Sequence, residues 1–61
     1  MGDYDVCVMK QVTYTVRGAE SAEDAIIQAI DYFRDDDLFY ESEEAENVTE
    51  EDCEIIWFEE Y

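Results

Sequence analysis

The chain has 61 residues, of which 19 are acidic and 3 are basic, so its formal net charge at neutral pH is -16. Such a charge repels nucleic acid and anionic membranes, which argues against direct binding of DNA, RNA or lipid. The chain contains no histidine, which removes the commonest member of catalytic triads and zinc sites.

Hydrophobic residues make up 48% of the chain and aromatic residues 15%, which is more than acidic disordered chains contain. This composition predicts one folded domain over residues 1–61, with an apolar core inside a charged shell. No apolar run is long enough for a signal peptide or a membrane span, so we expect a cytoplasmic protein, located in the host cytoplasm if a phage encodes it. Cys7 and Cys53 lack CxxC spacing, and we expect small buried residues whose redox state the sequence leaves open.

Residues 4–17 alternate between apolar and polar side chains, as a half-buried β-strand does. Every even position is apolar except Lys10, and a two-residue hairpin loop would split this set between the two faces. A three-residue loop at positions 9–11 keeps the set together, and we favour it. It would pair Val8 with Val12, Val6 with Tyr14, and Tyr4 with Val16. One long bent strand preserves the same pattern, so the sequence leaves that alternative open.

A helix is predicted over residues 21–34, after Gly18 ends the strand region. Ser21 is the expected N-cap, and the acidic pair in the first turn lies where the helix dipole favours negative charge. The apolar residues recur at helical spacing and form one stripe. This stripe consists of Ala22, Ala25, Ile26, Ala29, Ile30 and Phe33. Arg34 falls in the last turn, and the run of aspartates that follows it ends the helix.

The connection formed by residues 35–52 carries more than half of the acidic residues and has no sustained apolar period, so we expect a loop. A short apolar island at positions 38–40, Leu-Phe-Tyr, is either an edge strand or an anchor that holds this loop to the core. Positions 49–52, Thr-Glu-Glu-Asp, are expected to form a single capped turn.

Neither a metal site nor a catalytic site is expected in this acidic connection. An EF-hand register that begins at Asp35 places Phe39 at a ligand position and Tyr40 where glycine makes the turn. Catalysis by paired carboxylates needs a walled cleft that separates two pKa values, and a single thin layer of this size does not build one. We therefore predict a protein that is not an enzyme and has no cofactor.

A C-terminal strand is predicted over residues 53–58, which are rich in β-branched and aromatic side chains. Alternation would place Cys53, Ile55 and Trp57 on one face, and Ile56 and Phe58 on the other. The order β-β-α-β predicts an α+β fold, in which a small antiparallel sheet of about three strands carries one helix packed on one face. The second sheet face would lack cover and be partly apolar at Met9, Ile56 and Phe58, which leaves a homodimer open.

The acidic residues after position 34 are the strongest functional signal. Carboxylates lie roughly 6 to 7 Å apart at alternate strand positions and about 5 to 6 Å apart at helical spacing, near the phosphate separation of a nucleic-acid strand. Lys10, Arg17 and Arg34 all precede this segment, and no basic residue follows them. We therefore predict a nucleic-acid mimic that binds a basic surface of a nucleic-acid-binding protein, with two aromatic anchors. The predicted contact residues are Asp35, Asp36, Asp37, Phe39, Tyr40, Glu41, Glu43, Glu44, Glu46, Glu50, Glu51 and Asp52.

Small acidic domains with aromatic content are similar in type to phage-encoded inhibitors of bacterial nucleases, repair enzymes and CRISPR effectors. That similarity implies an anti-restriction or anti-CRISPR role for the predicted mimic. The alternative is salt adaptation, because proteins of salt-loving organisms and their viruses carry acidic surfaces and little lysine, and this chain has one lysine. The carboxylates would then serve solubility, without a partner.

Three stretches carry a family resemblance: YDV at positions 4–6, VTYTV at 12–16 and AESAEDA at 19–25. They lie within residues 4–34 and resemble the DpnD/PcfM-type small domain, which has an alternating strand region, an Ala-x-Ser helix start and a C-terminal acidic-aromatic strand. The resemblance implies an accessory protein of phages and mobile elements.

Overall fold

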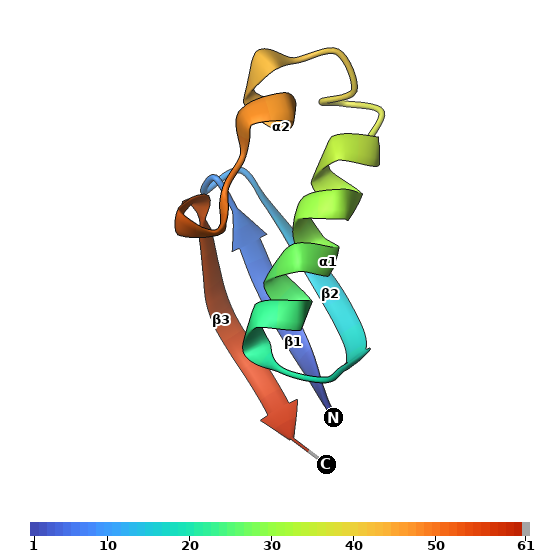
Figure 1. Cartoon of the computed structure of the whole chain (residues 1–61), viewed down its shortest axis with the longest axis vertical. Helices are drawn as coiled ribbons and strands as arrows, with labels where there is room; N and C mark the ends of the chain where they lie inside the picture. Colours follow the sequence, from blue (N-terminus) through green and yellow to red (C-terminus); the bar gives the residue numbers. More distant parts are fainter. Residues whose placement is uncertain (61) are drawn as a thin grey trace.

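The computed structural model describes residues 1–60. Its elements in chain order are β1 (Gly2–Val8), β2 (Val12–Ala19), α1 (Ala22–Asp35), α2 (Glu43–Asn47), the 3₁₀ helix η1 (Glu50–Asp52) and β3 (Cys53–Glu60). The three strands form one antiparallel sheet in the order β2-β1-β3, and α1, the main helix, lies across one face of it (Figure 1). The predicted α+β fold class is therefore confirmed.

The first two strands form the predicted hairpin, so the alternative of one long bent strand is wrong. The cross-strand pairs include Val8 with Val12, Val6 with Tyr14, and Tyr4 with Val16. Met9 and Lys10 adopt positive φ angles of 52° and 58°, and the Gln11 N–H donates to the Val8 carbonyl at 3.0 Å. Because neither residue is glycine or asparagine, each left-handed position costs about 1 to 2 kcal/mol.

The second strand continues past Gly18 to Ala19, so the prediction that Gly18 ends it is wrong. The pairing register shifts between Gly2 and Tyr4 of β1, and Gly18 has a positive φ of 69°. Glycine takes this conformation without a Cβ clash, which is why it suits a bulge in mid-strand. The Gly18 N–H, turned out of the ladder, donates to Asp3 Oδ1 at 3.0 Å.

The core lies between α1 and the inner face of the sheet. Val6, Val8 and Val16 are fully buried, because alternation places them on the helix-facing side of the two strands. The predicted helix stripe supplies the other side of the core, with Ala25, Ala29 and Phe33 fully buried. The small alanine side chains allow the helix to lie close to the sheet, as close packing of an interior requires.

The ends of α1 are capped by side-chain and backbone hydrogen bonds. Ser21 is the N-cap, as predicted, and its Oγ accepts a hydrogen bond from the Asp24 N–H at 3.1 Å. The helix ends at Asp35, and the N–H of the C-cap residue Asp36 donates to the Phe33 carbonyl at 3.3 Å. The acidic connection therefore starts from a fixed point on the core.

The segment after α1 is not a plain loop, which corrects the prediction for residues 35–52. The short helix α2 begins after Ser42, whose Oγ accepts a hydrogen bond from the Ala45 N–H at 3.1 Å. Ala45 is 2% exposed and Val48 4% exposed, so both tie the segment to the core. The predicted capped turn at 49–52 is confirmed as η1, with Thr49 as its N-cap.

The last strand runs to Glu60, beyond the predicted end at position 58, and it contains a bulge opposite β1. The pairs around the bulge are Tyr4 with Phe58, Asp5 with Trp57, and Val6 with Ile55. Phe58 therefore shares the helix-facing side with Ile55, and Trp57 lies on the opposite side. The predicted face assignment is wrong at these two aromatic residues, because the extra residue at the bulge, Ile56, reverses the alternation.

Candidate functional site

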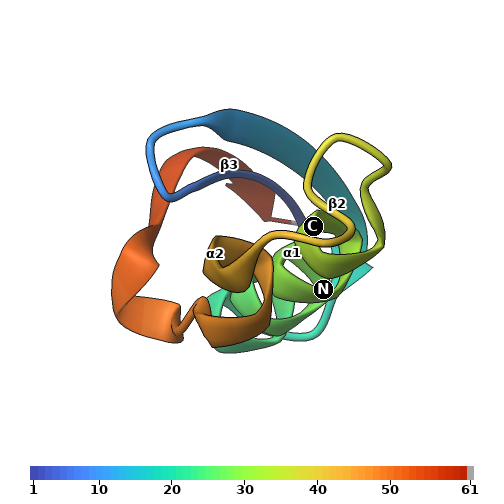
Figure 2. The same cartoon turned by 90° about the horizontal axis from the view of Figure 1, so that it is seen from above.

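Residues 35–52 lie in one half of an elongated molecule, whose extents are 36 × 18 × 14 Å. The turns after α1 and helix α2 form its tip, and η1 lies lower, beside the start of β3 (Figure 1). We call residues 35–52 the acidic end. In the view along the long axis, α2 lies over the space between α1 and the sheet (Figure 2), where Ala45 is buried. The N-terminus lies at the opposite end of the molecule (Figure 1). The segment therefore covers one end of the core.

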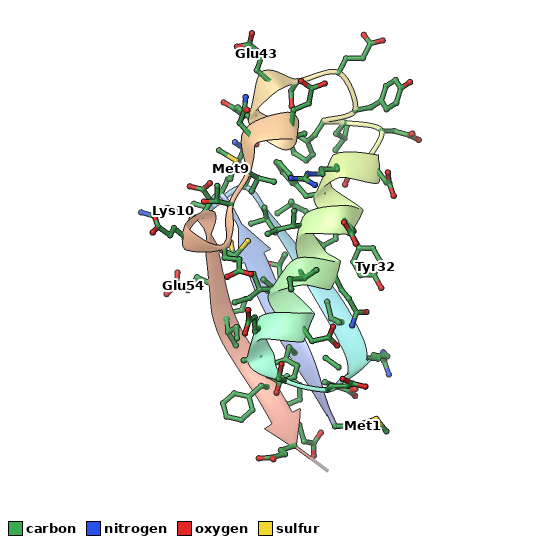
Figure 3. All side chains as sticks on the ribbon, in the orientation of Figure 1. Met1, Met9, Lys10, Tyr32, Glu43 and Glu54 are labelled. Carbon is green, nitrogen blue, oxygen red and sulfur yellow. The ribbon has the colours of Figure 1, made fainter. Side chains whose placement is uncertain are left out.

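Most of the predicted contact carboxylates are exposed to solvent. The exposed ones are Asp35, Asp37, Glu41, Glu43, Glu44, Glu46, Glu50, Glu51 and Asp52. Glu43 projects from the far tip of the molecule, at the start of α2 (Figure 3). Glu46 follows it at i, i+3 spacing in the same helix, a spacing that sets Cβ atoms about 5 to 6 Å apart. These carboxylates are thus presented from ordered backbone.

Asp36 differs from its neighbours because it makes two hydrogen bonds within the protein. Its carboxylate accepts from the Tyr14 hydroxyl at 2.7 Å and from the Leu38 N–H at 2.9 Å. The bond from the Leu38 N–H, and then the bond from Tyr14, hold the pKa of Asp36 below its usual range. Burial, and then the bond to Asp36, raise the pKa of the Tyr14 hydroxyl above its usual range. Asp36 thus fastens the start of the acidic end to β2.

Two further predicted contact residues also make internal hydrogen bonds. The Asp52 carboxylate accepts from the Thr49 N–H at 2.9 Å and from the Thr49 hydroxyl at 3.2 Å, which closes the turn of η1. Glu44 accepts from Gln11 Nε2 at 3.0 Å, which links α2 to the hairpin loop. Both carboxylates remain exposed, so they combine an internal role with a solvent-facing one.

The apolar island at positions 38–40 is a turn, and only its central residue reaches the core. Phe39 is half-buried, and its ring stacks on that of Phe33 with a centroid distance of 4.6 Å. Leu38 is 83% exposed and Tyr40 is 68% exposed. Of the two alternatives for the island, the anchor is confirmed and the edge strand is wrong. Leu38 is absent from the predicted contact residues, although an apolar side chain within an acidic run is itself a signal of contact.

The separation of basic from acidic residues along the chain does not persist in space. The Met9 N–H donates to the Asp52 carbonyl at 2.7 Å, which places the hairpin loop against η1, and Lys10 projects beside it (Figure 3). Arg34 lines a hollow of about 400 Å³ together with Tyr40 and Glu46 of the acidic end. Lys10 and Arg34 therefore border the acidic end, which corrects the expectation from sequence order.

The two cysteines are free thiols, and both are half-buried. Burial, followed by the charge of Asp52, raises the pKa of the Cys53 thiol. A raised pKa lowers the thiolate fraction and with it the reactivity of the thiol. Within residues 1–60, no group of three or more carboxylate and cysteine side chains is arranged to hold a metal ion.

No helix in the described part of the chain is both long and apolar enough to span a membrane. Comparisons with protein-family models, curated proteins and solved structures found no match to this chain. The resemblance to the DpnD/PcfM-type domain therefore stays a prediction, and the functional argument depends on the geometry of the acidic end.

Proposed function

We propose that this is a non-enzymatic interaction protein whose acidic end binds a basic surface of a nucleic-acid-binding protein in place of the nucleic acid. The observation that carries the proposal is the set of exposed carboxylates on α2, η1 and the turns between them, gathered in the half of the molecule that has α2 at its tip. A groove that binds phosphates through Lys and Arg accepts carboxylates at a similar spacing.

The internal hydrogen bonds of the acidic end support this proposal. Tyr14 holds Asp36, Gln11 holds Glu44, and Thr49 holds Asp52. An ordered segment loses less conformational entropy on binding than a flexible acidic tail does. The carboxylates therefore meet a partner in a preorganised arrangement.

Exposed apolar side chains within the acidic end provide a second contribution to binding. Leu38 and Tyr40 lie among the carboxylates and are largely exposed. Long-range charge accelerates encounter, whereas desolvated aromatic and aliphatic groups supply much of the affinity at interface centres. We assign the anchoring role to Leu38 and Tyr40, because Phe39 is stacked on Phe33.

The test compares two variants that lose the same charge at different places. The first carries Glu43→Gln and Glu46→Gln in α2, and the second carries Glu20→Gln beside α1 and Asp31→Asn within it. Each protein is immobilised and exposed to a bacterial lysate at low salt, and bound proteins are eluted with a double-stranded oligonucleotide.

The mimic should capture nucleic-acid-binding proteins that the oligonucleotide releases. Capture should fall for the α2 variant and persist for the α1 variant, because only the first changes the acidic end. Equal capture by both variants, or release by salt but not by the oligonucleotide, would contradict the proposal. Circular dichroism of each variant establishes that it is folded.

A second candidate function is a solubility surface adapted to high salt. It is favoured by the exposed acidic residues outside the acidic end, such as Glu20, Glu23 and Asp31, and by Lys10 and Arg34 at its border. Under this alternative, the protein unfolds in dilute buffer and refolds only in molar salt, and it captures no partner at any salt concentration. Far-ultraviolet circular dichroism across a salt series separates the two candidates.

A further inference from the structure

The last strand has an open edge. In the sheet order β2-β1-β3, β3 pairs with β1 along one side, and no strand within residues 1–60 pairs with its other side. An open edge presents unpaired N–H and C=O groups and is a template for a further strand. Natural proteins blunt such edges with charged residues, above all lysine, with proline or with β-bulges. β3 has no lysine or proline, and its bulge lies at Ile56.

The middle of this edge strand is apolar and exposed. Ile56 is 56% exposed, Trp57 52% and Phe58 58%. A groove of about 540 Å³ follows the same stretch. It is lined by Tyr4, Ala22, Ile55, Ile56, Trp57 and Phe58. One short segment of strand therefore offers both backbone hydrogen-bonding groups and a pocket for side chains.

The bulge at Ile56 shapes this surface. It brings Phe58 to the helix-facing side, where its ring stacks on that of Tyr4 with a centroid distance of 5.8 Å. It leaves Trp57 on the opposite side of the strand, across from Asp5. A segment that pairs with β3 would therefore meet one aromatic ring on each of its two faces.

Charge around the groove decides which occupant fits. Glu54 precedes the apolar stretch and Glu59 and Glu60 follow it, and all three are exposed. Glu23 adjoins Ala22 on the helix side and is exposed as well. A second copy of this chain would bring another β3 with the same acidic ends and another net charge of -16, which opposes self-association. An occupant with basic residues at both ends complements this rim.

We propose that the open edge of β3 binds an extended segment of a partner protein, in which a few apolar residues are flanked by Lys or Arg. The segment adds to the sheet as a fourth strand. Its backbone pairs with β3, one of its apolar side chains enters the groove beside Tyr4 and Phe58, and its basic residues meet Glu54 on one side and Glu59 and Glu60 on the other. Main-chain pairing supplies affinity in this mode, and the pocket supplies specificity. This surface is separate from the acidic end.

A designed peptide serves as the probe. It alternates valine with threonine and carries lysines at both ends, and a fluorescent label reports its binding by anisotropy. Trp57 is the only tryptophan of the chain, so its emission should shift to shorter wavelength when the peptide covers it. A second peptide has the same sequence but is N-methylated at alternate residues, which blocks pairing on the edge and leaves the charge unchanged.

We expect the unmodified peptide to bind at low salt and to shift the Trp57 emission. The N-methylated peptide should bind at least about tenfold more weakly, because several main-chain hydrogen bonds are lost. Ile56→Lys should weaken binding of the unmodified peptide by about tenfold or more, since it places a cation against a cationic segment and removes an apolar contact. Ile27→Lys is the matched control, because it makes the same exchange at an exposed isoleucine of α1 that does not line the groove, and binding should persist.

Four results would overturn the proposal. They are no binding of the unmodified peptide, equal binding of the N-methylated peptide, equal weakening by Ile56→Lys and Ile27→Lys, and saturation without a shift of the Trp57 emission. Sedimentation equilibrium adds a fifth: a dimer of this chain that Ile56→Lys dissociates would mean that a second copy occupies the edge. Circular dichroism of both variants establishes that each is folded.

Discussion

Single side chains at the acidic end divide into those that hold its backbone and those that face water. Asp36 belongs to the first group through Tyr14 and the Leu38 N–H, and Phe39 through the ring of Phe33. Glu43 belongs to the second group. The sequence does not separate the groups, because an aspartate that caps a turn and one that faces water look alike in an acidic run.

Tyr14→Phe tests the link between β2 and the acidic end. It should lower the free energy of unfolding only slightly, because the hydrogen bond that it removes ends on a carboxylate near water. Urea unfolding of both proteins measures the difference. Tyr40→Phe is the control, since the Tyr40 side chain is largely exposed, and it should leave the unfolding midpoint unchanged.

The Tyr14→Phe difference should also depend on pH. The pKa of Asp36 lies below its ordinary value of 3.8 in the folded protein, so its charged form is the one that folding favours. The contribution of the Tyr14–Asp36 hydrogen bond to the free energy of unfolding is therefore present above about pH 4. It is lost as the pH falls through the lowered pKa of Asp36. Urea midpoints of wild type and Tyr14→Phe should converge in acid, and a constant difference down to that range would exclude the carboxylate as the acceptor.

Phe39→Ala tests whether the apolar island is an anchor. It should destabilise the protein by about 2 kcal/mol, roughly half the cost at a fully buried phenylalanine, because the ring is only partly buried. Hydrogen exchange should accelerate first at the turns around Leu38 and Tyr40. Leu38→Ala, at the neighbouring exposed position, should change stability by less than about 0.5 kcal/mol. Equal destabilisation by the two substitutions would contradict the anchoring role of Phe39.

At the scale of elements, the sequence predicts features that depend on neighbouring residues, such as the hairpin loop and the start of a helix. The alternation of apolar and polar residues predicts the hairpin register, since only a three-residue loop keeps Val8 opposite Val12. A capping residue predicts the start of α1 at Ser21. The helix α2 is missed because Ala45 is its one buried residue, although Ser42 followed by two glutamates is an N-cap signal.

Bulges are the features that strand periodicity does not predict. The register shift at Ile56 depends on how β3 meets β1, which lies at the other end of the chain. Simple alternation therefore assigns Trp57 and Phe58 to the wrong faces. The same limit applies at Gly18, where the glycine forms a bulge and β2 continues to Ala19.

Lys10→Gly tests the strain in the hairpin loop. Glycine adopts a positive φ without a clash, so this substitution should stabilise the protein by about 1 kcal/mol. Lys10→Ala removes the same charge and keeps the Cβ atom, and it should give no such gain. Urea unfolding of the three proteins measures the effect. A gain of equal size in both variants would mean that the positive φ of Lys10 is not its source.

At the scale of the whole molecule, repulsion among the acidic residues opposes folding, and the positions of two basic residues in the fold reduce that repulsion. The chain carries a net charge of -16 within a body only 18 × 14 Å across its long axis, and self-repulsion of this kind favours expansion. Lys10 and Arg34 reduce the repulsion locally, because the fold returns both to the border of the acidic end. Sequence order hides this placement, since both residues precede the acidic segment.

Added sodium chloride should stabilise the protein. The Debye length falls from about 30 Å at 0.01 M to about 3 Å at 1 M, so the repulsion acts across the whole width in dilute buffer and is screened between neighbours at high salt. Thermal unfolding midpoints should rise steeply over this range. The variant with Glu43→Gln, Glu44→Gln and Glu46→Gln should be more stable than wild type at low salt and equal to it at high salt. A midpoint that does not change with salt would contradict this account.

The position of β3 in the sheet has a consequence for how fast the protein folds. The hairpin of β1 and β2 is local, but the pairing of β1 with β3 closes a loop that contains α1 and the entire acidic end. Closing a long loop before its contacts form is the slow part of folding. Here the acidic residues of the loop also repel one another. The transition state must therefore bring like charges together before β3 can pair with β1. Folding should therefore accelerate with ionic strength more than unfolding slows.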